Sequence, residues 1–124
     1  MPKDPSGRIT LRCIPDRIRV RAGGTLIADS RNPVELREIG YPPRRYLPRS
    51  DVVTARLQPS TTTSHCPFKG DATYYNLILD DGVIADAAWS YEAPYAAMAA
   101  IRGHIAFDSS ELVELAVDDD SETA

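Results

Sequence analysis

The sequence predicts a single small domain that is mainly β, built from twisted antiparallel sheets with one short helix near residues 94–100. The chain has 124 residues, which suits one domain and is enough to bury a core without disulfides or metal. Apolar and polar side chains alternate with a period of two over several segments. An Asp-Gly pair at 81–82 separates two β-rich runs, which is a strong signal for a hairpin.

The first expected element is a hairpin. Ile18 and Val20 alternate with three arginines, and Gly23-Gly24 supplies a turn before an extended pattern resumes at 25–29. Further along, Gly40-Tyr41-Pro42-Pro43 forces a bend, because each proline fixes φ and restricts the residue before it. The expected elements around this bend are strands at 34–39, 44–47 and 52–57 and a polar loop at 58–64.

The clearest hairpin joins residues 74–79 to 83–89, because Asp81-Gly82 supplies the positive φ angles of a tight turn. An alanine-rich helix follows at 94–100, with proline at its start and Gly103 after its end. The last expected elements are strands at 105–107 and 112–117. We expect a domain over residues 17–117, an N-terminal extension at 1–16 and an acidic disordered tail at 118–124.

Composition and charge narrow the class of protein. No apolar run approaches the roughly 20 residues of a membrane helix, and the N-terminus lacks the pattern of a secretory signal, so we expect a cytoplasmic protein with both cysteines as thiols. Residues 1–49 hold 11 Lys or Arg and 5 Asp or Glu, against 3 and 13 in residues 50–124. In one compact domain these halves neutralise one another, so we do not expect nucleic-acid binding.

Several motifs together point to a family. They are Ser30-Arg31, Gly40-Tyr41-Pro42-Pro43, Tyr46-Leu47-Pro48-Arg49, Thr63-Ser64-His65-Cys66-Pro67-Phe68-Lys69-Gly70-Asp71-Ala72, Trp89-Ser90-Tyr91 and Gly103-His104-Ile105-Ala106-Phe107. With these motifs in this order, the stretch from about Arg17 to Phe107 resembles the family named domain of unknown function 427. The resemblance implies a β-tent fold, like that of methionine sulfoxide reductase B and the thalidomide-binding domain of cereblon. The chain departs from the family at Asp108, where relatives place a tyrosine.

The resemblance does not imply a cofactor for this chain. Many β-tent proteins hold zinc between paired cysteine knuckles, but this chain has two cysteines and no Cys-x-x-Cys, so we expect no metal and no cofactor. The family is sometimes filed under a nucleotidyltransferase heading. That chemistry needs carboxylates that hold a metal beside a Gly-rich loop, whereas Asp80-Asp81 lies in a turn without such a loop.

Two residues are candidates for catalysis. Cys66 could be a nucleophile with a nearby cation, Lys69, to favour its thiolate, or it could be a small buried residue at a strand end. His65 is a poor partner for it, because neighbours in an extended segment point to opposite faces. Lys69 could equally hold a carboxylate or phosphate, or pair with Asp71.

The expected ligand-binding residues lie on two neighbouring segments, 66–71 and 89–91. They are Lys69, Gly70, Tyr74, Trp89 and Tyr91, with core packing as the alternative for Trp89 and ligand contact favoured for Tyr91. Arg44, Arg45 and Arg49 could also bind an acidic ligand or simply be solvated.

Two functions fit these residues. The first is the binding of a small anionic metabolite in a concave pocket, with catalysis as an open addition. The alternative is a noncatalytic structural or protein-interaction domain, in which the same motifs shape a turn and fill the core. The sequence leaves the oligomeric state open.

Overall fold

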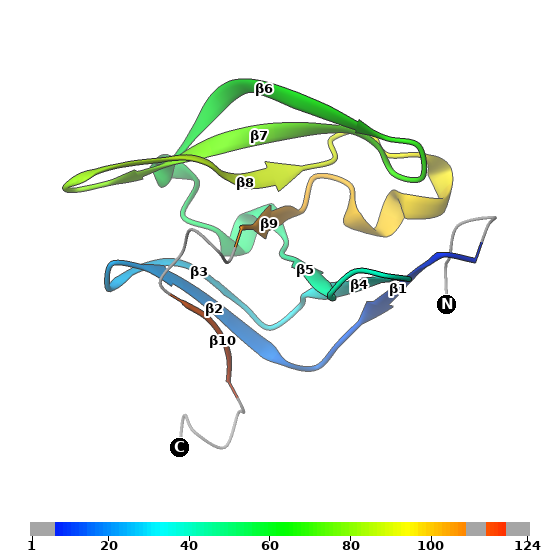
Figure 1. Cartoon of the computed structure of the whole chain (residues 1–124). Helices are drawn as coiled ribbons and strands as arrows, with labels where there is room; N and C mark the ends of the chain where they lie inside the picture. The colour runs from blue at the N-terminus through cyan, green and yellow to red at the C-terminus, as the bar shows by residue number, and fades with distance from the viewer. Residues whose placement is uncertain (1–6, 109–113, 119–124) are drawn as a thin grey trace.

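A computed structural model describes residues 7–108 and 114–118. Figure 1 shows two layers of antiparallel strands, one above the other in this view. The prediction of a small, mainly β domain with only short helical segments is confirmed. None of the helical segments in the described ranges has the length and apolar character that a membrane crossing requires.

The lower layer is a long, bent hairpin. Its first arm consists of β1 (Ile9–Cys13) and β2 (Arg17–Ala22), and its second arm of β3 (Thr25–Ser30) and β4 (Val34–Glu38). β1 pairs with β4 and β2 pairs with β3, all antiparallel. Both arms are interrupted at the same level, where Pro15 and Pro33 cannot donate a backbone hydrogen bond. One bond, from Ile14 N–H to the carbonyl oxygen of Pro33 (3.3 Å), spans this bend.

Short strands extend the two halves of this hairpin. β5 (Arg44–Tyr46) pairs with β4, and β10 (Glu114–Asp118) pairs with β2. The turn between β2 and β3 uses Gly23 and Gly24, both with positive φ, as the sequence predicts. The alternation along β2 is also confirmed, because Ile18 and Val20 are fully buried while the arginines between them are half-buried on the other face.

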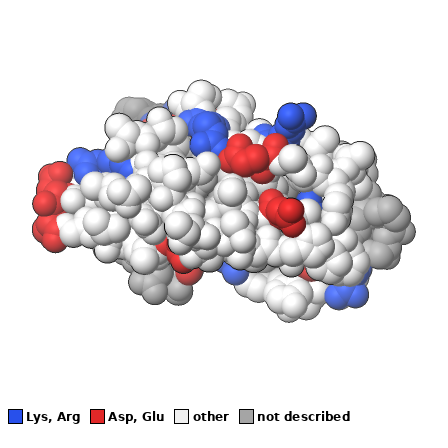
Figure 2. All heavy atoms as spheres, turned by 90° about the horizontal axis from the view of Figure 1, so that it is seen from above, with Lys and Arg blue, Asp and Glu red and all other residues white. Residues whose placement is uncertain are grey.

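The upper layer contains the longest strands. In order across the sheet they are β6 (Leu57–Cys66), β7 (Gly70–Leu79), β8 (Gly82–Ser90) and β9 (Ile105–Phe107). The predicted hairpin is present, with Leu79 opposite Gly82. The predicted positive φ angles are wrong, because residues 80–81 form the turn and neither Asp81 nor Gly82 has a positive φ. The predicted helix is a kinked 3₁₀ segment, η3 (Ala96–Ile101), which buries Met98 and Ile101 against the lower layer. Figure 2 shows the outer face of this layer, where charged side chains occupy only a few separate spots.

Two sequence-based expectations about the middle of the chain are wrong. Residues 54–56 of the predicted strand at 52–57 instead form a 3₁₀ turn, η2 (Thr54–Arg56), and another 3₁₀ turn, η1 (Arg49–Asp51), precedes the predicted strand. The predicted polar loop at 58–64 is strand β6, which lies at the edge of the sheet and pairs with β7. A strand that pairs on one side and exposes most of its side chains needs no apolar alternation, and its threonines are β-branched residues that favour extended backbone.

The folded region also begins before residue 17, because Ile9 and Leu11 of β1 are buried in the core. The acidic tail expected at 118–124 lies outside the described residues, apart from Asp118 at the end of β10.

The core has two parts. One lies between β2 and β3 below and β7, β8 and β9 above, and contains Ile18, Val20, Ile27, Leu77 and Ile105. The other lies between β1, β4 and β5 below and η3 with the ends of β7 and β8 above, and contains Leu11, Leu36, Tyr46, Tyr91 and Met98. The second part borders the candidate site.

The outer face of the lower layer carries one buried carboxylate, Glu35 in β4, which is 3% exposed. Burial alone would raise the pKa of Glu35, but the hydrogen bond from Arg37 and the charges of Arg37, Arg45 and Arg12 together hold this pKa below its ordinary value of 4.5. A carboxyl group with a lowered pKa stabilises the fold where it is ionised.

We therefore expect Glu35→Gln to lower the free energy of unfolding by about 1 kcal/mol near pH 7, because charge-assisted hydrogen bonds are lost. The stabilisation by Glu35 is complete above pH 4.5 and is lost as the pH falls through the lower folded-state pKa. Urea titrations from pH 7 to pH 3 measure this difference between wild type and variant. A difference that stays constant, or grows, toward pH 3 would contradict the assignment.

Candidate functional site

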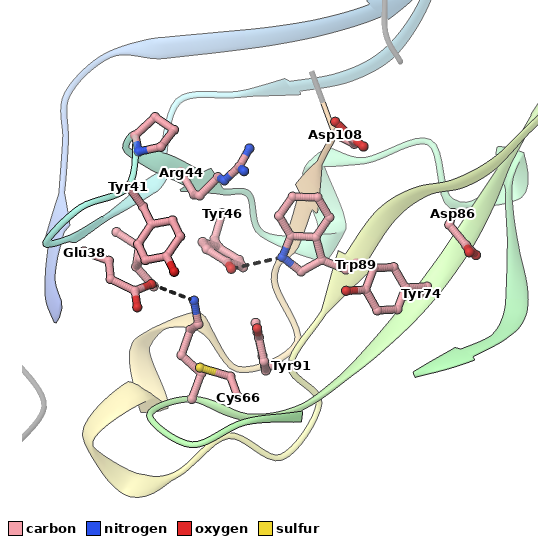
Figure 3. A pocket seen from close by; sticks show the side chains of 13 residues that line it. Glu38, Tyr41, Arg44, Tyr46, Cys66, Tyr74, Asp86, Trp89, Tyr91 and Asp108 are labelled. Atoms are coloured by element: carbon pink, nitrogen blue, oxygen red, sulfur yellow. Dashed lines mark hydrogen bonds and ion pairs between the residues drawn. The ribbon is translucent and has the colours of Figure 1, made fainter. Parts of the chain in front are cut away.

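A hollow of about 430 Å³ is lined by side chains from both layers (Figure 3). The lower layer contributes β4, β5 and the bend between them, and the upper layer contributes β7, β8 and the turn before β7. The side chains around it are mainly aromatic or charged. They belong to Leu36, Glu38, Tyr41, Pro42, Arg44, Tyr46, Cys66, Lys69, Tyr74, Asp86, Trp89, Tyr91 and Asp108.

The turn between β6 and β7 sets the position of Lys69. The Lys69 N–H donates to the carbonyl oxygen of Cys66 (3.2 Å), and its own carbonyl accepts from the Tyr95 N–H (3.0 Å). Gly70 follows with φ of 113°, and a Cβ there would lie 3.5 Å from the Cα of Pro94. Gly70 therefore lets the backbone reverse against the segment that leads into η3. It was expected to bind ligand, but it does not line the hollow.

Lys69 points into the hollow rather than into solvent. Its Nζ donates to Oε1 of Glu38 at 3.2 Å, and both side chains are only 13% exposed. The same Nζ lies 5.8 Å from the centroid of the Tyr91 ring. The alternative pairing with Asp71 does not occur, because Asp71 lies on the outer face and contacts Nδ1 of His65 at 2.7 Å. The hollow thus contains an ammonium group that is largely shielded from water.

Trp89 forms the central wall of the hollow. Its Nε1–H donates to the hydroxyl oxygen of Tyr46 (3.1 Å), and its ring centroid lies 6.4 Å from that of Tyr74, the residue opposite it in β7. Burial raises the pKa of Tyr46 to about 12, although the hydrogen bond from Trp89 acts in the other direction. Tyr46 is therefore a neutral phenol over the physiological pH range.

Of Trp89 and Tyr91, the sequence suggested that Tyr91 would be the more exposed, but the structure shows the reverse. Tyr91, the favoured contact residue, is only 6% exposed and packs in the core, 6.3 Å from the Tyr46 ring. Burial, followed by the proximity of Tyr46, raises the pKa of Tyr91 above its ordinary range. Trp89, the favoured core residue, is half-buried and lines the hollow. Tyr91 leaves the sheet just after β8 and turns inward under Lys69, whereas Trp89 is held in register opposite Tyr74.

Arg44, one of three arginines that the sequence left open as contacts for an acidic ligand, also lines the hollow. Its guanidinium carbon lies 5.5 Å from the centroid of the Trp89 ring. Within the described part of the chain, the Arg44 side chain has no hydrogen bond or ion pair. The alternation along β5 could have found it, because Arg44 and Tyr46 share one face while Arg45 points to the other. Glu38 had no such local signal, since it meets Lys69 across 31 residues.

Cys66 also lines the hollow, at its inner end near Tyr91 (Figure 3). The predicted opposite orientation of His65 is confirmed, because its ring lies on the outer face, edge-on to Tyr95. His104 contacts the carbonyl oxygen of Arg102. Neither histidine lines the hollow. Among residues 7–108, no three His, Cys, Asp or Glu side chains come together in a group that could hold a metal ion.

Comparison with known proteins identifies a family. A family model described as a domain of unknown function, DUF427, matches residues 10–119, which is most of the chain. No curated protein matches it. The matched range begins within β1 and continues past β10, so it contains every strand that contributes to the hollow.

The bond between Trp89 and Tyr46 can be tested directly. We expect Tyr46→Phe to lower the free energy of unfolding by about 1 kcal/mol or more, because a half-buried indole N–H loses its acceptor. Fluorescence from Trp89, the only tryptophan, should change as well. Chemical denaturation and emission spectra measure both effects, with exposed Tyr41→Phe as the matched control. Equal behaviour of the two variants would show that the bond contributes nothing.

Proposed function

We propose that this chain, which belongs to the DUF427 family, binds a small molecule that carries an anionic group and a planar portion, in the hollow beside Trp89. The observation that carries the proposal is the Arg44 guanidinium, which faces the hollow without an ion pair or hydrogen bond from the described residues. A guanidinium presents a planar fork of donors that fits a carboxylate or phosphate.

The hollow is lined by two cations and three carboxylates, so the support for an anion comes from where the charges lie and not from their sum. Lys69 is a second cation in the same hollow, and its partner Glu38 neutralises only one positive charge. Asp86 lies at the far end, where its carboxylate accepts hydrogen bonds from the hydroxyls of Ser60 and Thr62 (Figure 3). Asp108 lies near the Trp89 ring. An anionic group that approaches Arg44 from the Tyr41 side is thus nearer to the two cations than to Asp86.

Aromatic side chains support a planar portion. Trp89 and Tyr74 form one wall, and Tyr41 stands on the opposite rim with 64% of its surface exposed. A flat ligand placed between these walls would cover apolar ring surface that now faces water, which favours binding. Ligand pockets typically combine such apolar walls with a few convergent polar groups.

The proposal concerns binding rather than a reaction. Cys66 supplies a thiol at the inner end of the hollow, but neither histidine lines the hollow, so neither is placed as its general base. The alternative of a purely structural domain would leave the hollow without a ligand. A filled or convex surface at this place would have favoured that alternative.

The single tryptophan lies in the proposed site, so its fluorescence reports occupancy. We expect benzoate and phenyl phosphate to change Trp89 emission in a saturable way and benzamide, the neutral analogue of benzoate, to do so far more weakly. Arg44→Gln should weaken benzoate binding roughly 10- to 100-fold, because a charge-assisted hydrogen bond contributes about 1.5–3 kcal/mol.

Arg102→Gln is the matched control, since it removes the same charge from an exposed arginine that does not line the hollow. It should leave benzoate binding unchanged. Equal binding of benzamide and benzoate, or no response to any of the three compounds, would rule out an anion site centred on Arg44.

Glu38 provides a test in the opposite direction. Because Glu38 competes with a bound anion for Lys69, we expect Glu38→Gln to strengthen benzoate binding roughly tenfold, and Lys69→Gln to weaken it. Fluorescence titration at constant ionic strength measures both. If Glu38→Gln weakens binding, the ion pair forms part of the recognition surface and the proposed competition is wrong.

A further inference from the structure

A second cluster of charged side chains lies on the outer face of the lower layer, away from the hollow. Three arginines surround the buried carboxylate of Glu35. Oε1 of Glu35 accepts from Nε of Arg37 at 2.8 Å and from Nη2 of Arg12 at 3.3 Å, and Oε2 lies 3.7 Å from Nη2 of Arg45. One negative charge therefore faces three positive charges, which leaves an excess of two.

Most of the donors in this cluster are available. Arg12 and Arg37 have side chains that are 57% and 61% exposed, and each uses a single nitrogen to reach Glu35. The Nε of Arg45 is buried and has no hydrogen-bond partner in the described part of the chain. Thr10, Arg12, Glu35 and Arg37 line a shallow hollow of about 310 Å³. Guanidinium groups on opposite sides of one depression can bind an anion together.

We infer that this outer cluster is a binding site for a small, multiply charged phosphate compound. A phosphoryl or pyrophosphate group has two or more negative charges, which complement the excess of two, and its oxygens accept the paired N–H donors of Arg12 and Arg37. Glu35 fixes both guanidiniums beneath the ligand, so less side-chain freedom is lost on binding than at two isolated arginines.

The surroundings favour a compact anion over a long one. The four lining residues lie close together on neighbouring strands rather than in a stripe, and the chain as a whole has a net charge of −4. Screening limits the charges that a small anion senses to those within about 10 Å, whereas a nucleic-acid strand would also meet the acidic parts of the surface.

This site is separate from the hollow of the proposed function. Along β4, Leu36 and Glu38 face the inner hollow while Glu35 and Arg37 face outward. Along β5, Arg44 faces the inner hollow and Arg45 faces outward, toward Glu35. The two sites lie back to back across the same strands, so each can be tested without the other.

Inorganic pyrophosphate, titrated at constant ionic strength, is the probe. We expect the side-chain Nε–H signals of Arg12, Arg37 and Arg45 to shift in nitrogen–proton correlation spectra. The affinity should fall at least tenfold in Arg12→Gln/Arg37→Gln, and rise several-fold in Glu35→Gln, which removes the only negative charge of the cluster. Arg44→Gln should have no effect on pyrophosphate binding.

Arg56→Gln/Arg102→Gln is the control, because it changes the net charge by the same amount at positions outside both sites. An equal loss of affinity in this control would show that only overall charge matters and would overturn the inference. Tighter binding of a 16-residue oligothymidylate than of pyrophosphate, counted per phosphate, would also overturn it. If Arg12→Gln/Arg37→Gln does not fold, Glu35→Gln decides, since unchanged or weaker binding in that variant contradicts the site.

Discussion

The position of the hollow depends on a junction between the two layers. Leu47 and Ile105 exchange a pair of backbone hydrogen bonds, each 2.8 Å long, which join the end of β5 in the lower layer to β9 in the upper layer. Beside this junction the Trp89 indole donates to Tyr46 and adds a side-chain link between β8 and β5. These contacts join the two layers at one border of the hollow, because Tyr46 and Trp89 also line it.

The same junction explains why charged groups can occupy the hollow. Lys69 comes from the turn at the end of the upper layer, and Glu38 comes from the end of β4 in the lower layer. A partly buried ammonium is stable only with a partner, and Glu38 supplies it from the opposite layer. Arg44 is stabilised instead by the face of Trp89, because a guanidinium is attracted to an aromatic ring. One cation of the hollow is therefore paired with a carboxylate and the other retains its donors.

Sequence reasoning succeeded where the signal was local. The Gly23-Gly24 turn, the pairing of β7 with β8 and the alternation of β2 all depend on a few adjacent residues, and all are present, although the turn before Gly82 forms without the predicted positive φ angles. It failed at β6, because an exposed edge strand of serine and threonine has the composition of a loop and is defined only by pairing with β7. The β-tent type implied by the family resemblance stays a prediction.

In the candidate site, too, the features with a local signal could be predicted and those that depend on distant segments could not. The juxtaposition of Lys69 with the aromatic segment at 89–91 followed from two motifs expected on one hairpin, and the distance from Lys69 to Tyr91 agrees with it. Glu38 could not be foreseen, because its contact with Lys69 depends on how the two layers close. The burial of Tyr91 in place of Trp89 could not be foreseen for a similar reason, since it depends on the path of the chain after β8.

A crystal structure of the chain with 4-bromobenzoate would show whether an anion binds between the layers. We expect an anomalous bromine peak inside the hollow, with the carboxylate within hydrogen-bond distance of the Arg44 guanidinium and the ring beside Trp89. A saturated crystal with the bromine peak elsewhere on the molecule, or with the carboxylate directed away from Arg44, would contradict this expectation.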